Sequence, residues 1–182
     1  RNNTDWTMIG RYSYKYAGTW SQFNQFTSPP DEEFGLMAGM GGYYLRWQEE
    51  SGSTTGDPKT KEWGLTADVM GKWGGLSGYG AAYYTGYDGS RGNPRGHQKV
   101  FGALLQGSVY SDPKNEYFAR VEYADVQSDN QLSATYTVDP DPKTDLALFT
   151  LGWNHYIDGQ DLKLSAEVGW SIDEVSALWV ND

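Results

Sequence analysis

The sequence predicts an all-β protein, either an antiparallel up-and-down transmembrane β-barrel of about eight to nine strands or a part of a larger barrel. Three observations lead to this fold class. Apolar and polar residues alternate with a period of two in most segments, no segment repeats apolar residues at helical spacing, and short turn-rich connections alternate with long polar ones. Glycine, at 23 of 182 residues, also disfavours long helices. Nothing marks an internal linker, so we expect residues 1–182 to form one β-barrel domain or a fragment of one.

Four strands are predicted in the N-terminal half of the chain. Trp6–Tyr16 alternates apolar and polar residues, whereas Phe34–Trp47 is glycine-rich and apolar on both faces, so its orientation stays open. Trp63–Trp73 shows a clear alternation, with apolar residues at every second position. The last of the four is Tyr79–Tyr87, and its predicted apolar face consists of Tyr79, Ala81, Tyr83, Thr85 and Tyr87.

Four more strands are predicted in the C-terminal half. Phe101–Val109, Glu116–Ala124 and Ala147–Trp153 each carry an apolar residue at every second position. Leu162–Ile172 alternates apolar residues with mostly polar ones, and it shows no helical component. A candidate ninth strand begins near Val175.

The connections between these strands alternate in length. A membrane barrel has this asymmetry because tight turns join its strands at one rim and longer loops extend from the other. The stretch Gly18–Glu33 departs from the rule, since it is long where a short turn is expected. The short connections are Trp73–Gly75, Ser111–Asn115 and Asp158–Asp161, and the long ones are Glu49–Thr60, Asp88–Gln98 and Ser128–Thr144.

Aromatic residues at the ends of the apolar faces favour contact with lipid. Ten residues separate Trp63 from Trp73, a span of about 33 Å along the strand, which a tilt near 40° projects to about 25 Å, the height of the apolar band of a membrane barrel. The same pattern is predicted for the pairs Trp6 and Tyr16, Tyr79 and Tyr87, and Tyr117 and Tyr123. Rings at these positions would lie at the level of the lipid headgroups.

The opposite faces combine charged residues with small ones. In a membrane barrel such residues line a water-filled lumen, whereas in a soluble up-and-down barrel, with its apolar face inward, they would meet solvent. The candidate pore-lining residues are Arg11, Lys15, Asp68, Lys72, Arg120, Glu122, Lys163 and Glu167.

Two stretches, Phe26–Leu36 and Phe149–Leu164, resemble the phosphate-selective porin O and P family of bacterial outer-membrane channels. The resemblance implies a homotrimeric barrel of about sixteen strands in the outer membrane, which passes small solutes and ions. Because this chain has about half the length that so many strands need, we expect it to be the later part of a porin. The family's ladder of arginines is not evident, since only Arg11 and Arg120 fall cleanly on a lumen-type face. Phosphate selectivity is therefore not carried over.

The composition and the motifs exclude several other kinds of chemistry. The 24 acidic residues outnumber the 14 basic ones, which argues against binding of nucleic acid. The absence of cysteine and the presence of only two histidines, His97 and His155, give no metal-ligand spacing, and no Gly-x-Ser-x-Gly sequence is present. No apolar run reaches the roughly 18 residues of a transmembrane helix. We expect no catalytic residues, no metal and no cofactor.

The leading hypothesis is thus a non-enzymatic porin that spans a lipid bilayer and lets small solutes or ions diffuse passively. The alternative is a soluble or surface β-barrel that binds carbohydrate or a small hydrophobic ligand through its 8 tryptophans and 14 tyrosines. A third option is a small structural or adhesive barrel of eight strands, whose interior would have to be filled by side chains.

Overall fold

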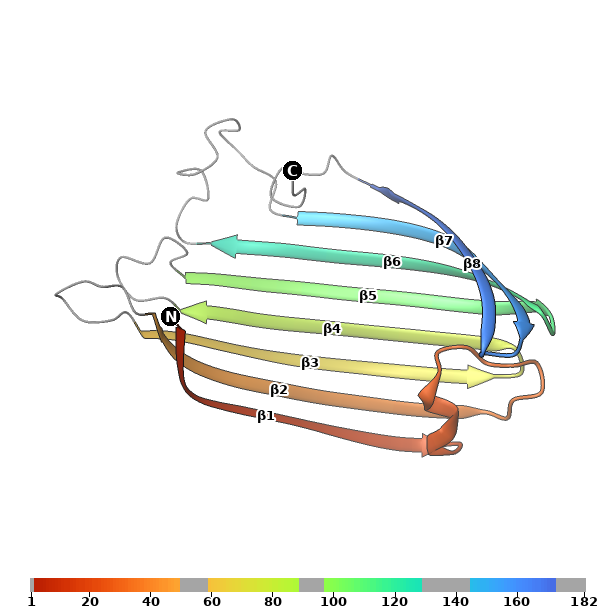
Figure 1. Cartoon of the computed structure of the whole chain (residues 1–182), viewed down its shortest axis with the longest axis horizontal. Helices are drawn as coiled ribbons and strands as arrows, with labels where there is room; N and C mark the ends of the chain where they lie inside the picture. Colours follow the sequence, from red (N-terminus) through yellow and green to blue (C-terminus); the bar gives the residue numbers. More distant parts are fainter. Residues whose placement is uncertain (1, 50–58, 89–96, 129–144, 173–182) are drawn as a thin grey trace.

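The structure, a computed structural model, describes residues 2–49, 59–88, 97–128 and 145–172. Eight antiparallel strands form one sheet, in which each strand is paired with its neighbours in the chain (Figure 1). All eight predicted strands are present, and the candidate ninth near Val175 lies outside the described residues. The strands are β1 (Asn2–Ala17), β2 (Gly35–Glu49), β3 (Lys59–Trp73), β4 (Leu76–Asp88), β5 (His97–Asp112), β6 (Asn115–Ser128), β7 (Asp145–Asp158) and β8 (Leu162–Ser171).

Helical structure in the described part of the chain is confined to the 3-10 helix η1 (Trp20–Asn24). It lies in the segment of residues 18–34, which joins β1 to β2. No helix among the described residues is long and apolar enough to cross a membrane.

The register between neighbouring strands is regular over the middle of the sheet. Shifts occur only close to strand ends, at Thr4/Trp6, Lys15/Ala17, Tyr110/Asp112 and Tyr156/Asp158. Because successive side chains of a strand point to opposite faces, an unbroken register keeps each alternating set on one face of the whole sheet.

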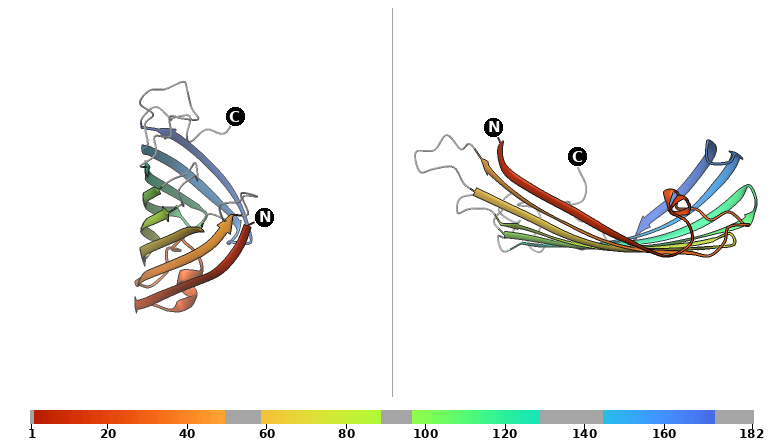
Figure 2. Two further views of the ribbon diagram at one scale, coloured as in Figure 1. Left: turned by 90° about the vertical axis from the view of Figure 1, so that its left-hand side faces the viewer. Right: turned by 90° about the horizontal axis from the view of Figure 1, so that it is seen from below.

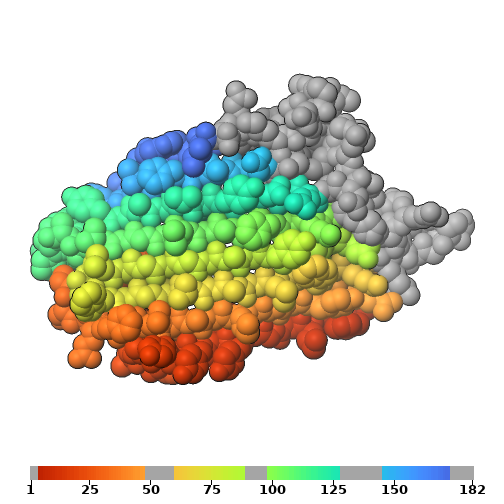
Figure 3. Space-filling model, turned by 180° about the vertical axis from the view of Figure 1, so that it is seen from behind, coloured from red at the N-terminus to blue at the C-terminus, as the bar shows by residue number. Residues whose placement is uncertain are grey.

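The sheet is curved into an open trough (Figure 2). The segment of residues 18–34 lies on the concave side, which faces the viewer in Figure 1. The opposite, convex surface is formed by the strands themselves, side by side (Figure 3). Within the described residues β1 and β8 are the two edge strands and do not pair with each other.

For six strands, namely β1, β3, β5, β6, β7 and β8, the predicted apolar set lies on the convex face. The orientation of β2, which the sequence left open, is given by its pairing. Met40 of β2 pairs with Tyr12 of β1 and with Ala67 of β3, which places the even-numbered residues of β2 on the convex face.

The predicted apolar face of β4 is wrong. Tyr79 pairs with Gln106 and Met70, and Tyr83 pairs with Thr66, so the set from Tyr79 to Tyr87 lies on the concave face. The convex face of β4 consists of Leu76, Gly78, Gly80, Ala82, Tyr84 and Gly86. Both sets of this strand are built from small and aromatic residues, so alternation alone did not separate them.

Glycines close two of the short turns as predicted. Gly74 and Gly75 join β3 to β4 with φ of 52° and 87°, and Gly159 in the β7–β8 turn has a φ of 49°. These left-handed conformations favour glycine, which has no Cβ to clash. The strands are antiparallel, so these turns, the β5–β6 turn and residues 18–34 all lie at one end of the sheet, which we name the short-turn end (Figure 1).

The β5–β6 turn depends on the Asp112 carboxylate. Its oxygens accept hydrogen bonds from Asn115 Nδ2 at 2.8 and 3.0 Å and from the Lys114 backbone N–H at 2.9 Å. Because these hydrogen bonds stabilise the charged carboxylate, they lower the pKa of Asp112. The bonds from Asn115 have the largest effect, followed by the bond from Lys114. The short side chain thus replaces the backbone bonds that such a tight turn lacks.

Aromatic side chains cover glycines across neighbouring strands on the concave face. A Cβ added to Gly102 would lie 2.1 Å from the Tyr83 ring, and one added to Gly152 would lie 2.0 Å from the Phe118 ring. In both cases the two residues are direct cross-strand partners. The glycine therefore provides the space in which the ring of the adjacent strand packs against the sheet.

We predict that Gly102→Ala weakens the sheet while Gly78→Ala does not. The added methyl group at residue 102 displaces the Tyr83 ring, whereas a Cβ at residue 78 meets no atom within 4 Å. Overpacking of this kind costs about 1–3 kcal/mol of unfolding free energy, against less than about 0.5 kcal/mol at an open position. Urea unfolding measures the free energy of unfolding of both variants, and equal stabilities would contradict the packing role of Gly102.

The concave polar face as candidate functional site

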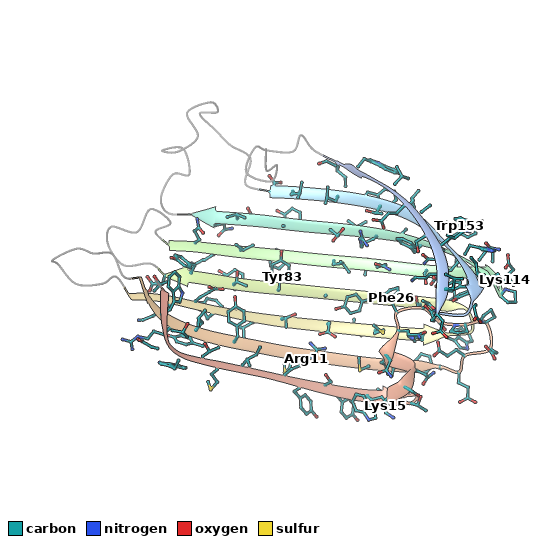
Figure 4. All side chains as sticks on the ribbon, viewed as in Figure 1. Arg11, Lys15, Phe26, Tyr83, Lys114 and Trp153 are labelled. Atoms are coloured by element: carbon teal, nitrogen blue, oxygen red, sulfur yellow. The ribbon has the colours of Figure 1, made fainter. Side chains whose placement is uncertain are left out.

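All eight predicted pore-lining residues lie on the concave face. Residues that pair from strand to strand form rows across the sheet. Asp68 and Glu122 share one row, and Lys15 and Arg120 share the next row toward the short-turn end. Lys72 and Glu167 share the row after that. Arg11 lies one row toward the opposite end of the sheet, and Lys163 lies at the short-turn end, paired with Tyr156. Side chains far apart in the sequence therefore share one surface. Figure 4 labels two of them, Arg11 and Lys15, on β1.

Two pairs of the predicted residues form ion pairs. Arg11 Nη2 lies 2.8 Å from Asp68 Oδ2, although β2 runs between the two strands. Gly39 makes this reach possible, because a Cβ at that position would lie 2.3 Å from Arg11 Nη2. Arg120 Nε lies 2.9 Å from Glu122 Oε2 on the same strand. Each pair lowers the net field that its members would exert alone.

Lys72 anchors the segment of residues 18–34 to the sheet. Its side chain is 1 % exposed, and Nζ donates hydrogen bonds to the backbone oxygens of Gln22 and Thr27, the latter at 2.7 Å. Glu32 Oε2 lies 3.9 Å away. A buried ammonium group needs such partners, because desolvation without them is costly. Lys72 is therefore a structural anchor and not a free charge of the surface.

Further contacts hold the same segment over the short-turn end. Phe26 meets the Tyr79 ring edge-on at a centroid distance of 5.9 Å. The Thr27 hydroxyl lies 3.0 Å from the Tyr110 hydroxyl and accepts a hydrogen bond of 3.2 Å from Gln160 Nε2. The segment thus covers part of the concave face (Figure 4).

A buried glutamate lies beside this segment. Glu116 is 1 % exposed, and its two oxygens accept hydrogen bonds from Ser108 Oγ at 2.5 Å, Asn154 Nδ2 at 2.9 Å and Tyr156 Oη at 2.5 Å. Ser108 Oγ in turn lies 2.6 Å from Ser77 Oγ. The network joins β4, β5, β6 and β7, and it satisfies a carboxylate that would otherwise be expensive to bury.

A hollow of about 220 Å³ opens on the concave face next to this network. Three of the predicted residues line it, namely Arg120, Lys163 and Glu167, together with Phe26 of the connecting segment and Phe118 of β6. Lys163 Nζ also lies 5.9 Å from the centre of the Tyr156 ring.

The charges of the concave face nearly balance. The predicted set contains five basic and three acidic residues, and Glu32, Glu62 and Glu116 add three more carboxylates on the same side of the sheet. A surface with so even a mixture exerts no strong field of one sign. Among the described residues, no group of three or more acidic or histidine side chains lies close enough to hold a metal ion.

Sequence reasoning did not select Glu116, Tyr156 or Phe26 for this surface. Glu116 stands in the polar set of its strand, but nothing in the sequence marks it as buried. Phe26 belongs to an irregular segment whose position depends on Lys72. The alternation of apolar and polar residues does not predict where such a segment packs on the sheet. His155 lies on β7, with Nδ1 2.9 Å from Asn115 Oδ1.

Comparison with protein-family models, curated proteins and solved structures gives no significant match for this chain. The functional argument therefore depends on the fold and on the chemistry of its two faces.

We predict that Lys72→Met releases the segment of residues 18–34. Two hydrogen bonds from a charged donor are lost, each worth about 1.5–3 kcal/mol, so the local opening that exposes Phe23 and Phe26 becomes at least about tenfold more frequent. Limited proteolysis with chymotrypsin measures the cleavage rate. Lys99→Met is the control, because Lys99 is an exposed lysine of β5. Equal cleavage of both variants would show that Lys72 does not hold the segment.

Proposed function

We propose that this chain forms the wall of an outer-membrane porin, a water-filled channel through which small solutes or ions diffuse passively. One observation carries the proposal: the apolar side chains lie on the convex face of the sheet, and the charged ones lie on the concave face. Strand pairing assigns each set to its face, and Figure 2 shows the curvature. When a sheet closes, its concave face becomes the interior, so the interior would be polar and the exterior apolar. This is the arrangement of a membrane barrel.

The burial pattern supports a lipid-facing exterior. Among the described residues, Tyr156 is the only buried apolar side chain, and the other buried residues with side chains are polar or charged. Large apolar side chains of the convex face are exposed instead, for example Leu105 at 67 % and Met40 at 61 %. A continuous apolar surface of this size is unfavourable in water and marks a surface that contacts lipid or another protein.

An aromatic band across the convex face supports the same conclusion. Rings from neighbouring strands lie close together in four pairs, with centroid distances of 5.0 to 6.3 Å. Cross-strand pairing continues the band between these pairs, as between Tyr44 and Trp63 and between Tyr84 and Phe101. The band contains one residue of each strand: Trp6, Tyr44, Trp63, Tyr84, Phe101, Tyr123, Phe149 and Trp170.

Such a band is expected where the hydrocarbon core of a membrane meets water, because aromatic rings favour the headgroup level. On the convex face beyond it lie mostly small and aliphatic residues, such as Ala67, Ala82 and Leu105. Toward the short-turn end, Trp73 and Tyr117 supply a second, less complete set of rings. The strands have 10 to 16 residues, enough to cross an apolar layer of about 25 Å at a tilt near 40°.

Closure of the channel requires more strands than the eight described. Within the described residues the outer edges of β1 and β8 have no partner strand, so they expose backbone donors and acceptors, which the interior of a bilayer does not tolerate. We propose that further strands complete a barrel of about sixteen, the size that leaves an aqueous channel. A closed barrel of eight strands would be filled by its own side chains.

The alternative of a soluble β-barrel that binds a ligand needs the opposite curvature. In such a barrel the apolar side chains gather on the concave face and the charges meet solvent. Here the rings of Trp63 and Trp73 lie on the convex face. The two proposals therefore predict different changes in stability when a charged residue is introduced on the convex face.

We predict that Leu105→Arg destabilises the protein in a bilayer by about 2–4 kcal/mol, the cost of an arginine near the middle of the lipid-facing surface of a barrel. Leu104→Arg provides a matched control, because Leu104 is the same residue type at the adjacent position and faces the concave side. Unfolding by guanidinium in lipid vesicles measures the free energy of unfolding of both variants. In a water-soluble protein Leu105, which is 67 % exposed, would tolerate arginine within about 0.5 kcal/mol. That result would contradict a lipid-facing β5.

We predict that the protein leaves outer membranes only with detergent and gives discrete conductance steps in planar bilayers. Exchanging Arg120 and Lys163 for glutamate should then shift the reversal potential toward cation selectivity, because both side chains line the concave face. Lys61→Glu is the control, since Lys61 lies on the same face as Trp63. A monodisperse protein in plain buffer would overturn the porin proposal, and an unchanged reversal potential in the double variant would show that these residues do not line the channel.

A further inference from the structure

The hollow on the concave face has the composition of a binding site and not merely of a channel wall. Its volume of about 220 Å³ is below the range of roughly 300–1,000 Å³ that is typical of sites for drug-sized ligands, and it suits a solute of about one sugar ring. Two aromatic rings, Phe26 and Phe118, line it together with amide, hydroxyl and charged side chains.

The charges that line the hollow cancel. The lining contains two basic side chains, Arg120 and Lys163, and two acidic ones, Glu116 and Glu167. Glu122 pairs with Arg120 at 2.9 Å but is not part of the lining. An anion attracted by the two basic groups meets two carboxylates, and a cation meets two basic groups. The balance favours a solute without net charge.

The polar groups that remain available include both donors and acceptors. Glu116 and Asn154 are bonded to each other and to their neighbours. Within the described part of the chain, in contrast, no hydrogen bond engages the Gln106 amide, the Lys163 ammonium or the Glu167 carboxylate, and Arg120 uses only Nε. A hydroxyl group both donates and accepts, so a solute with several hydroxyls can use all of these groups, whereas a simple ion can use only one kind.

The two rings are fixed before any solute arrives. Phe118 packs over Gly152, as the 2.0 Å approach to an added Cβ shows. Phe26 is held by its edge-on contact with Tyr79, and the next residue, Thr27, is bonded by Lys72 and Gln160. The negative face of an aromatic ring attracts the polarised C–H groups of a sugar ring, and a ring that is already ordered loses little entropy on binding.

From these observations we infer that the hollow between Phe26 and β5–β8 binds a neutral, hydroxyl-rich solute of monosaccharide size on its way through the channel. This inference rests on the proposed function, since it names the class of solute that the channel would carry. Phe118 and Phe26 provide the apolar surface, while Gln106, Lys163 and Glu167 provide the hydrogen bonds.

Planar bilayers that contain the complete protein test this inference, with D-glucose as the probe and L-alanine and sodium phosphate as zwitterionic and anionic competitors. Glucose should reduce the ion current in a saturable manner and at a lower concentration than either competitor. Phe118→Ala and Gln106→Ala should each raise the half-saturating glucose concentration by about two- to tenfold. Phe101→Ala, which removes a ring from the convex face, should leave that concentration unchanged.

If Phe118→Ala does not fold, Gln106→Ala still tests the inference. This substitution should leave folding intact, because the Gln106 amide makes no hydrogen bond within the described residues. The inference is overturned if glucose does not change the ion current, or if the half-saturating glucose concentration is the same in the wild type and in Gln106→Ala. Neither outcome would contradict the porin proposal. Tighter binding of alanine or phosphate overturns the inference as well.

The absence of conductance steps would overturn the porin proposal instead. In that case, saturation-transfer NMR with glucose and the detergent-solubilised protein tests the hollow directly. Glucose signals that weaken in Gln106→Ala would support the binding site, and the absence of transfer would overturn it.

Discussion

The unbroken antiparallel register from β1 to β8 is the constraint on which the rest of this structure depends. A slip of one residue in any strand would move its whole apolar set to the concave face and its charges to the convex face. The register shifts are confined to strand ends, so the two faces stay separate over the middle of all eight strands. Both the aromatic band and the rows of charged residues are consequences of this continuity.

Polar contacts, and not a packed apolar core, connect the elements on the concave side of the described sheet. Glu116, with its three hydrogen bonds, joins β5, β6 and β7 near the short-turn end, and Lys72 fixes the segment of residues 18–34 to the same region. A fully satisfied network of this kind is stable and specific, since each member would be costly to bury alone. The hollow beside it is lined by Phe26 of that segment and by residues of β5 to β8. The proposed binding site is thus a product of the network and not of the strands alone.

Much of the fold was accessible from alternation and turn residues. The eight strands and the placement of all eight candidate residues on one face follow from the period of two, because that period is a direct consequence of strand geometry. The glycine turns follow from the turn residues in the short connections. Prediction failed for β4, where Tyr79 to Tyr87 and the opposite set are both small or aromatic. It also left β2 unoriented, because a glycine-rich strand with apolar residues on both sides carries no signal of its own. Tyr44 and Tyr84, the members of the aromatic band on these two strands, were missed for the same reason.

By itself, the sequence determined the type of each element and the division of most strands into an apolar and a charged side, because both properties are local. The tertiary structure alone decided which side is convex, since the direction of curvature is a property of the whole sheet and not of any single strand. It also decided which charges meet. Arg11 reaches Asp68 only because Gly39 leaves space on the strand between them, and Lys72 is an anchor only because residues 18–34 fold back over it. Such contacts join residues that are distant in the chain, and no short-range pattern encodes them.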